Sequence, residues 1–281
     1  MKTSEQHPAY RWCGRTDPGR FRKRNEDSFL ALQVDAEQIY YLGKDGTGTM
    51  AQHDFLFAVS DGMGGHEGGN FASRLVVEKL ARLMPRAFRM AVSGFARAED
   101  DVLTELFDQI HRDLVYNGRF YEECRSMGAT LSMVWISHEK TFFAHIGDSR
   151  IYHLPAKGGM RQVTHDHTHV GWLLRQGKIT PLEARLHKAK NQLQKALGGN
   201  CKDAEPQIGT IDFNRGDRLV LCTDGVADGI GEKVIETVVR NPSPRLAGLP
   251  VSERLIQEAK EGASRDNITA VVVGAEPCSW G

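Results

Sequence analysis

Short apolar runs bordered by aspartates recur along this chain and constrain its fold more than any other feature. The runs are rich in β-branched and aromatic residues and are bounded by Gly, Asp or Ser, as is typical of β-strands. They comprise Phe55–Val59, Ala129–Ile136, Thr141–Ile146, Arg150–Leu154, Arg218–Cys222 and Ile268–Val273, with a further strand region that begins at Asn25–Ser28 (NEDS). If these strands share sheets, the aspartates at their ends can converge.

Three other segments show the spacing of amphipathic helices. Their apolar stripes are Phe71, Leu75, Val76, Leu80 and Leu83 in the first, Val102, Leu103, Leu106, Phe107, Ile110 and Leu114 in the second, and Leu255, Ile256 and Ala259 in the third. Acidic residues open the second helix, and Gly118 is expected to end it. Because the strands come in hairpins and the two long helices are grouped, the pattern predicts an α+β fold of antiparallel sheets with helices packed outside them.

Two segments are expected to lie outside the strands and helices named above. Asn241–Pro250 is a loop by composition, and residues 35–54 form a polar, Gly-rich surface excursion between two strands. Within the excursion, Lys44–Thr49 (KDGTGT) invites a phosphate-loop interpretation. It lacks the Gly-Lys-Ser/Thr ending and the following helix, so a flexible hairpin tip is expected instead.

Composition narrows the class of protein. The chain has 281 residues, of which 40% are apolar and 26% charged, and its formal net charge is zero. Zero net charge argues against a broad nucleic-acid surface. No segment approaches the roughly 20 apolar residues of a membrane span, and no secretion signal opens the chain. The five cysteines form no CxxC pair, so reduced thiols and a cytoplasmic location are expected.

The aspartates at the strand ends are Asp61, Asp148, Asp224 and Asp266. Any one of them alone is typical of a turn, but four at the ends of separate strands weaken that interpretation. Carboxylates packed together raise one another's pKa, and a bound cation removes that conflict. Carboxylate and carbonyl oxygens suit Mg²⁺ or Mn²⁺ rather than Zn²⁺, and Gly62 lets the backbone approach an ion closely because it has no Cβ.

Two such ions would acidify a water and neutralise a phosphate, so the pattern favours hydrolysis of a phosphate ester. A site of this kind also needs a cationic fork for the phosphoryl oxygens, which arginine provides. On an expected strand, Arg20, Arg22 and Arg24 would lie on one side and Lys23 on the other. The alternation does not select the working arginine.

Taken together, the motifs resemble the metal-dependent serine/threonine protein phosphatases of type 2C, the PPM family, in their compact bacterial form. The resemblance runs from about Arg11 to Gly274. Its elements are TDPGRFRKRNEDS, FAVSDGMGGHEGGNFAS, GATLSMVWI, FFAHIGDSRIYHL, VTHDHTHV, NQLQKALG, LVLCTDGVAD and SRDNITAVVV. It implies a four-layer α/β/β/α sandwich of two antiparallel sheets flanked by helices, with metals at one end between the sheets.

The resemblance also implies roles for single residues. Asp61, Asp224 and Asp266 would bind a first Mn²⁺ or Mg²⁺ ion. Asp61, the Gly62 carbonyl and Glu26 would serve a second, with Asp27 acting through water. Asp148 and Asp224 resemble the acids of a third, weaker site. Arg22 would bind phosphate and Asn267 fits the DN motif; a metal-bound hydroxide would attack directly, without a phosphoenzyme.

The chain departs from the family pattern at several positions. Met63 stands where many eukaryotic members have the histidine proposed as general acid, and methionine cannot give a proton. His66, three residues on, is a candidate for the loop or the leaving group. Asn70 replaces a usual glutamate, and little consequence is expected. In the flap, Lys188 and Lys190 replace a usual proline and arginine.

The flap itself is expected over about residues 165–200, with Gly177 and Pro181 separating two short helices. At its start, His165, His167 and His169 alternate and could bind zinc if they lay on a strand. The resemblance places them in a helical segment instead, where they would diverge.

The organisation expected is a flexible tail over 1–9, one catalytic domain over 10–276 and a tail over 277–281. The leading hypothesis is a protein phosphatase that acts on phosphoproteins and reverses a serine/threonine kinase, as a monomer without nucleic-acid or membrane partners. Two alternatives remain. One is an inactive phosphatase domain that binds a phosphoprotein, and the other is a zinc-dependent hydrolase built on the histidines.

Overall fold

The structure is a computed structural model that describes residues 9–50, 53–64, 68–92, 99–120, 126–262 and 264–275. Within these ranges, β1 already begins at Ala9. Among the described residues, no helix is long and apolar enough to cross a membrane.

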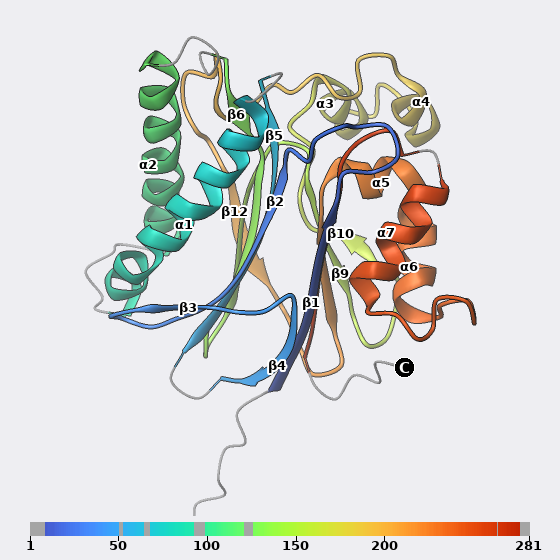
Figure 1. Cartoon of the computed structure of the whole chain (residues 1–281), viewed down its shortest axis with the longest axis horizontal. Coiled ribbons are helices and arrows are strands. Elements are labelled where there is room, and N and C mark those ends of the chain that lie inside the picture. The colour runs from blue at the N-terminus through green and yellow to red at the C-terminus, as the bar shows by residue number, and fades with distance from the viewer. Residues whose placement is uncertain are drawn as a thin grey trace, which may run out of the picture.

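Two antiparallel sheets face each other at the centre of the molecule (Figure 1). The six-stranded sheet has the order β10-β9-β13-β14-β1-β4, with β1 at Ala9–Asp17, β4 at Asp45–Thr49, β9 at Arg150–Leu154, β10 at Arg161–Gln162, β13 at Arg218–Cys222 and β14 at Ile268–Ala275. The eight-stranded sheet contains β2 (Asp27–Val34), β3 (Ile39–Tyr41), β5 (Asp54–Met63), β6 (Gly128–Ala129), β7 (Leu131–Ile136), β8 (Thr141–Ile146), β11 (Leu197–Gly198) and β12 (Gln207–Ile211).

Helices cover the outer face of each sheet (Figure 1). On the eight-stranded sheet lie α1 (Gly68–Val92) and α2 (Glu99–Phe120). On the six-stranded sheet lie α5 (Asp224–Ile230), α6 (Glu232–Arg240) and α7 (Val251–Glu261). The short helices α3 (His169–Arg175) and α4 (Pro181–Leu186) form the flap above the strand ends. The expected four-layer α/β/β/α sandwich is therefore confirmed.

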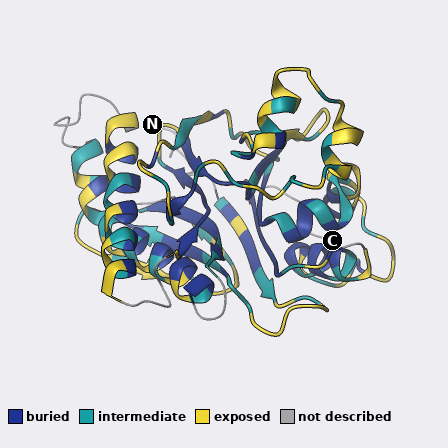
Figure 2. Ribbon diagram, turned by 90° about the horizontal axis from the view of Figure 1, so that it is seen from above, coloured by how far each residue is buried: buried dark blue, intermediate teal, exposed yellow. Residues whose placement is uncertain are grey.

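The alternation of side chains along β5 shows how one strand serves two cores. Phe55, Phe57 and Val59 pack between the two sheets, whereas Leu56 and Ala58 pack against α1 and α2. Successive residues of a strand point to opposite faces, so a strand covered on both sides reads as one continuous apolar run. Figure 2 shows the buried strands in dark blue between the more exposed helices.

The helices differ in detail from the sequence-based expectation. All six apolar residues predicted for the second helix are buried, but α2 continues past Gly118 to Phe120. In α1, Phe71 does not belong to the core face, because its side chain is 42% exposed and Ala72 is buried instead. In the flap, α3 and α4 are separated near Gly177 and Pro181, as expected.

The Gly-rich excursion is not a flexible hairpin tip. Residues Asp45–Thr49 form β4, which pairs with β1 at the edge of the six-stranded sheet. Its glycines are required by packing: a Cβ on Gly46 would lie 2.4 Å from the Trp12 ring, and one on Gly48 would lie 2.9 Å from the Phe55 ring. Glycine lowers strand propensity, so this strand could not be found by its propensity.

Candidate metal centre at the strand ends

Asp61 lies near the end of β5, opposite Asp27 of the neighbouring strand β2. Its backbone is held by Thr130, whose hydroxyl accepts a hydrogen bond from the Asp61 N–H at 2.9 Å. The next residue, Gly62, donates its N–H to the Glu26 carbonyl at 3.1 Å. Two adjacent strands of one sheet therefore bring Glu26, Asp27 and Asp61 together.

Gly62 occupies a space that admits no side chain. A Cβ at this position would lie 1.9 Å from the Gly69 carbonyl oxygen and 2.9 Å from the Glu26 carbonyl oxygen. A Cβ on Gly69 would in turn lie 2.8 Å from the Gly62 carbonyl oxygen and 3.0 Å from Glu26 Oε2. Both the Gly62 carbonyl and the Glu26 carboxylate thus face the same small space beside the start of α1.

Asp27 links the two sheets. One carboxylate oxygen, Oδ2, accepts hydrogen bonds from the hydroxyls of Thr223 at 2.8 Å and Thr269 at 2.7 Å, which both belong to the six-stranded side. The other oxygen, Oδ1, is buried and has no hydrogen-bond partner within the described part of the chain. Sequence reasoning missed the two threonines, although Thr223 directly precedes Asp224.

Asp224 is the first residue of α5, immediately after β13. Its Oδ1 is also buried without a hydrogen-bond partner among the described residues, and its Oδ2 accepts from Asn191 Nδ2 of the flap at 3.4 Å. A Cβ on Gly225 would lie 1.9 Å from the Asn267 carbonyl oxygen, so α5 begins tightly against the segment before β14.

Asn267 ties that segment to the arginine-rich loop. Its amide donates to the carbonyls of Arg24 at 2.8 Å and Pro18 at 3.0 Å, and its Oδ1 accepts from the Glu26 N–H at 2.8 Å. The loop between β1 and β2 is not a strand, so the expected alternation of its arginines is wrong.

Arg22 is brought to the carboxylates by this loop. Its Nη2 donates to Asp266 Oδ2 at 2.7 Å, and the guanidinium is half exposed. No such contact is found for Arg20 within the described residues. Arg22 is therefore a candidate arginine whose side chain reaches the acidic cluster in this structure.

Asp148 lies in the turn where the chain leaves β8 in one sheet and enters β9 in the other. It is 9% exposed. Burial raises its pKa to about 7, and the nearby Asp166 and Asp228 carboxylates add to the rise while Arg150 opposes it.

The other buried acids also have raised pKa values. Burial raises the pKa of Asp27 to about 7. The pKa values of Asp61 and Asp224 are raised well above the usual range, first by burial and then by neighbouring carboxylates of the cluster. The cost of this arrangement is offset when a cation lies among the oxygens.

The donor set fits a hard divalent cation. Buried carboxylate oxygens that lack a hydrogen-bond partner in the described part of the chain, together with an inward-facing carbonyl, are ligands of the kind that Mg²⁺ and Mn²⁺ take. Within the described ranges, no three His, Cys, Asp or Glu side chains already stand at metal-holding distances from one point. We therefore expect the carboxylates to draw closer together when cations bind.

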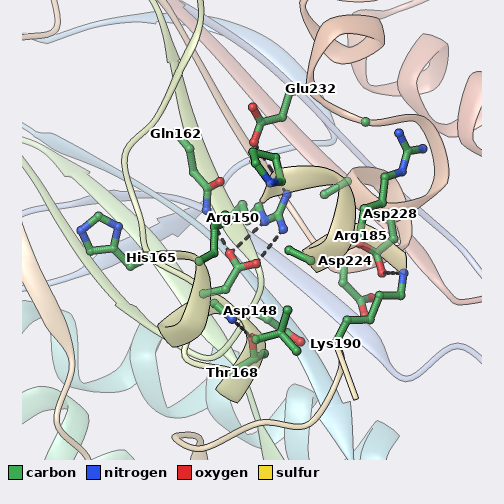
Figure 3. A pocket seen from close by; sticks show the side chains of 18 of the residues that line it. Asp148, Arg150, Gln162, His165, Thr168, Arg185, Lys190, Asp224, Asp228 and Glu232 are labelled. Carbon is green, nitrogen blue, oxygen red and sulfur yellow. Dashed lines mark hydrogen bonds and ion pairs between the residues drawn. The ribbon is translucent and has the colours of Figure 1, made fainter. Parts of the chain in front are cut away.

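A pocket of about 700 Å³ opens beside Asp148 and Asp224, between the flap and the α5–α6 region (Figure 3). Two ion pairs hold its walls. Arg150 binds Asp166 through both carboxylate oxygens at 2.9 and 2.6 Å, and Lys190 of the flap pairs with Asp228 of α5. Sequence reasoning missed Asp228, although it lies one helical turn after Asp224 on the same face.

The remaining candidates lie as follows. His66 falls outside the described residues, and Met63 ends β5, opposite Gly128 of β6. His165 and His167 precede the flap helix instead of lying within it, while His169 begins it. The three histidines make different contacts: the His165 N–H donates to Gln207 Oε1, the His167 ring packs on His145, and the His169 ring stacks on Trp172.

The raised acid pKa values predict how stability changes with pH in the absence of metal. His145 and His167, whose pKa values are lowered to about 4 and about 3 by burial, are neutral in the folded chain, and in the unfolded chain they lose their protons as pH passes about 6.5. Between pH 6.5 and pH 8 they therefore raise the free energy of unfolding only slightly, and the buried acids dominate the change. The buried acids then bind more protons in the folded chain than in the unfolded chain, so the free energy of unfolding falls as pH rises.

Thermal unfolding in EDTA at pH 6.5 and pH 8 measures this effect. We expect a lower Tm at pH 8, and a larger rise in Tm on adding Mn²⁺ at pH 8, because bound ions need ionised carboxylates. A Tm that rises with pH in EDTA would contradict the assigned burial of the acids.

Comparisons with known proteins agree with this geometry. The family description "Protein phosphatase 2C" matches residues 44–255. The serine/threonine phosphatase Stp of Listeria innocua is 30% identical over 260 residues, covering 92% of this chain and 93% of that protein. The serine/threonine protein phosphatase PstP of Mycobacterium tuberculosis is 30% identical over 275 residues, covering 96% of this chain. The chain spans only 46% of that relative's length.

Solved structures give the same result. The serine/threonine phosphatase of S. agalactiae matches with a TM-score of 0.75 and 27% identity, covering 95% of this chain and all of that one. The catalytic domain of PstP in complex with two manganese ions matches with a TM-score of 0.71 and 29% identity, covering 95% of this chain and 99% of that one. The chain, whose strand-end carboxylates fit divalent cations, belongs to the protein phosphatase 2C family.

Proposed function

We propose that this protein is a Mn²⁺- or Mg²⁺-dependent protein serine/threonine phosphatase. The observation that carries the proposal is the gathering of Glu26, Asp27, Asp61, Asp148, Asp224 and Asp266 at one end of the sandwich, where one oxygen each of Asp27 and Asp224 has no hydrogen-bond partner among the described residues. The names of the relatives and the two manganese ions of one structural neighbour support the reaction and the cofactor.

In this proposal, Asp61 would provide ligands to two ions. Asp224 and Asp266 would complete the first position, and the Gly62 carbonyl with Glu26 would complete the second, supported by Asp27. Asp148 and Asp224 would form a weaker third position. When bound, such ions lower the pKa of water and neutralise phosphoryl charge. Asp27 holds the two sheets in register at this point through Thr223 and Thr269.

Arg22 has the chemistry to orient the substrate. Its planar guanidinium can donate two parallel hydrogen bonds to phosphoryl oxygens. The side chain is half exposed, lies against Asp266 and is anchored by a loop that Asn267 fixes to Glu26. A phosphate that enters the site would therefore take over donors that now bind a carboxylate.

Replacing Arg22 with alanine tests this role. We expect KM for a phosphopeptide to rise about tenfold or more, since a charge-assisted hydrogen bond contributes about 1.5–3 kcal/mol. Tm is expected to change little, because an exposed ion pair contributes only about 0–1 kcal/mol to stability. Arg20→Ala is the matched control. An equal rise in KM for Arg20→Ala would mean that the wrong arginine is assigned.

The proposed function is tested by phosphate release from phosphothreonine and phosphotyrosine peptides with Mn²⁺, with Mg²⁺ and with EDTA. We expect release from the phosphothreonine peptide with either metal and none with EDTA. Failure of release with every divalent ion, in a folded protein, would favour a domain that binds phosphoproteins without cleaving them. The physiological substrates are inferred to be proteins phosphorylated by a serine/threonine kinase.

A further inference from the structure

A second pocket lies beside the metal centre, on the side of α1. It has a volume of about 700 Å³ and is lined by Arg24 and Asn25 of the loop before β2 and by Asn70, Phe71, Arg74 and Glu78 of α1. In Figure 1 the start of α1 and the flap helices lie on different sides of the strand ends. The pocket is therefore separate from the flap pocket, and none of its lining residues is used in the proposed reaction.

The pocket is continuous with the metal centre through both segments that line it. Arg24 and Asn25 directly precede Glu26, and Asn70 directly follows Gly69. Gly69 lies against Glu26, because a Cβ added at Gly69 would be 2.8 Å from the Glu26 carboxylate carbon. The Asn70 amide joins the two segments by donating to the Asn25 carbonyl at 2.6 Å. A peptide with its phosphorylated residue at the metals would carry its neighbouring residues across this opening.

The charge of the pocket favours an anion. Arg24 and Arg74 are positive, and Glu78 is the single acid among the lining residues. Because Arg24 already takes part in another interaction, Arg74 is the charge on which an anion site here depends. Arg74 is exposed, and within the described part of the chain it makes no hydrogen bond or ion pair. An exposed arginine beside an anion site is a ready partner for a carboxylate or phosphate.

The pocket also offers an apolar wall. Phe71 was expected in the core but leaves 42% of its surface exposed here, next to Leu75. A ring at this position packs against the aliphatic part of a peptide residue while the arginine binds its charged end. In this arrangement the exposed Phe71 ring contacts the substrate instead of the core.

We propose that this pocket binds an anionic side chain of the substrate, close in sequence to the phosphorylated residue. The ligand is a carboxylate or a second phosphate on the same peptide. The proposal rests on the proposed phosphatase function and adds a substrate preference to it: phosphopeptides with a flanking anion are the better substrates.

The test compares kcat/KM for phosphothreonine peptides that differ at one flanking position. Three series place alanine, aspartate or a non-hydrolysable phosphonate in turn at each position near the phosphothreonine. We expect at least one aspartate position to raise kcat/KM about fivefold over alanine, the upper range for an exposed ion pair. A phosphonate that exceeds aspartate identifies a second phosphate as the ligand, and equal effects identify a carboxylate.

Arg74→Glu and the matched control Arg82→Glu locate the effect. Arg82 is also exposed on α1, but it does not line the pocket. The ratio of kcat/KM between the anionic and alanine peptides should fall to about one in Arg74→Glu and stay near fivefold in Arg82→Glu. High salt should reduce the ratio in the wild type, because exposed charges are screened.

The proposal would be overturned if the wild-type ratio of kcat/KM between anionic and alanine peptides were near one at every position. It would also be overturned if Arg74→Glu left the ratio intact, or if both variants abolished it alike. Its failure is distinguishable from that of the proposed function. If the alanine peptides are not hydrolysed at all in the presence of Mn²⁺, the phosphatase function fails. If they are hydrolysed as well as the anionic peptides, only the anion pocket fails.

Discussion

Asp61→Asn should abolish phosphatase activity and at the same time stabilise the metal-free protein. In the metal-free fold, the pKa of Asp61 is raised well above its usual value by burial and by the surrounding carboxylates. An asparagine of the same shape removes that repulsion, so the free energy of unfolding rises. It also removes the proposed ligand shared by two ions. Residues that only support metal ligands cost about 10- to 100-fold when replaced, so we expect a loss of at least about 100-fold in kcat.

The measurement pairs Tm in EDTA at pH 8 with phosphate release in Mn²⁺. We expect the variant to have the higher Tm in EDTA and to gain less Tm than the wild type when Mn²⁺ is added. A variant that loses activity because it is misfolded would instead show a lower Tm in EDTA, and one that keeps full activity would remove Asp61 from the site.

Gly62→Ala should disrupt the site by steric force alone. The new methyl group would lie 1.9 Å from the Gly69 carbonyl oxygen. Because that oxygen belongs to the backbone, the clash can be relieved only if the backbone moves. Separating β5 from the start of α1 displaces the Gly62 carbonyl and Glu26 together. Overpacking of this kind costs about 1–3 kcal/mol, and the displacement is expected to lower kcat at least about 100-fold.

Gly159→Ala is the matched control, because a Cβ there meets nothing within 4 Å. Thermal unfolding and phosphate release on both variants measure the effect. We expect Gly159→Ala to retain the Tm and the activity of the wild type. If Gly62→Ala does the same, the close approach of β5 to α1 is not what positions the second ion.

Much of the fold could be predicted because burial leaves a direct trace in the sequence. Strands covered on both faces, such as β5 and β7, contain largely apolar runs, and the long helix α2 shows its buried stripe at every expected position. The strand β4 could not be found in this way. Its glycines are selected by the rings of Trp12 and Phe55, which are distant in sequence.

The acids of the candidate site could be predicted for a different reason. A carboxylate at the end of an apolar strand is costly unless something offsets it, so Asp61, Asp148 and Asp224 attract notice without knowledge of the fold. Their partners carry no such signal. Thr223 and Thr269 bind Asp27 only because two sheets meet there, and Asn191 reaches Asp224 only because the flap folds over α5.

The fold also explains why the phosphate-binding role of this arginine-rich segment could be expected from the sequence, whereas its loop conformation could not. The expected alternation of the arginines assumed a strand, whereas the loop takes its conformation from contacts with Asn267. Those contacts fix the loop in which the Arg22 guanidinium reaches Asp266. The choice among arginines is therefore made by tertiary structure.

The central claim is that the strand-end carboxylates hold two divalent cations through Asp61. Equilibrium binding of Mn²⁺ at pH 8, measured in the wild type and in Asp61→Asn, tests it most directly. We predict two tightly bound ions per chain in the wild type and a loss of both tight sites in the variant, with the fold retained. A wild type that binds no Mn²⁺, or a variant that binds as many ions with the same affinity, would contradict the claim.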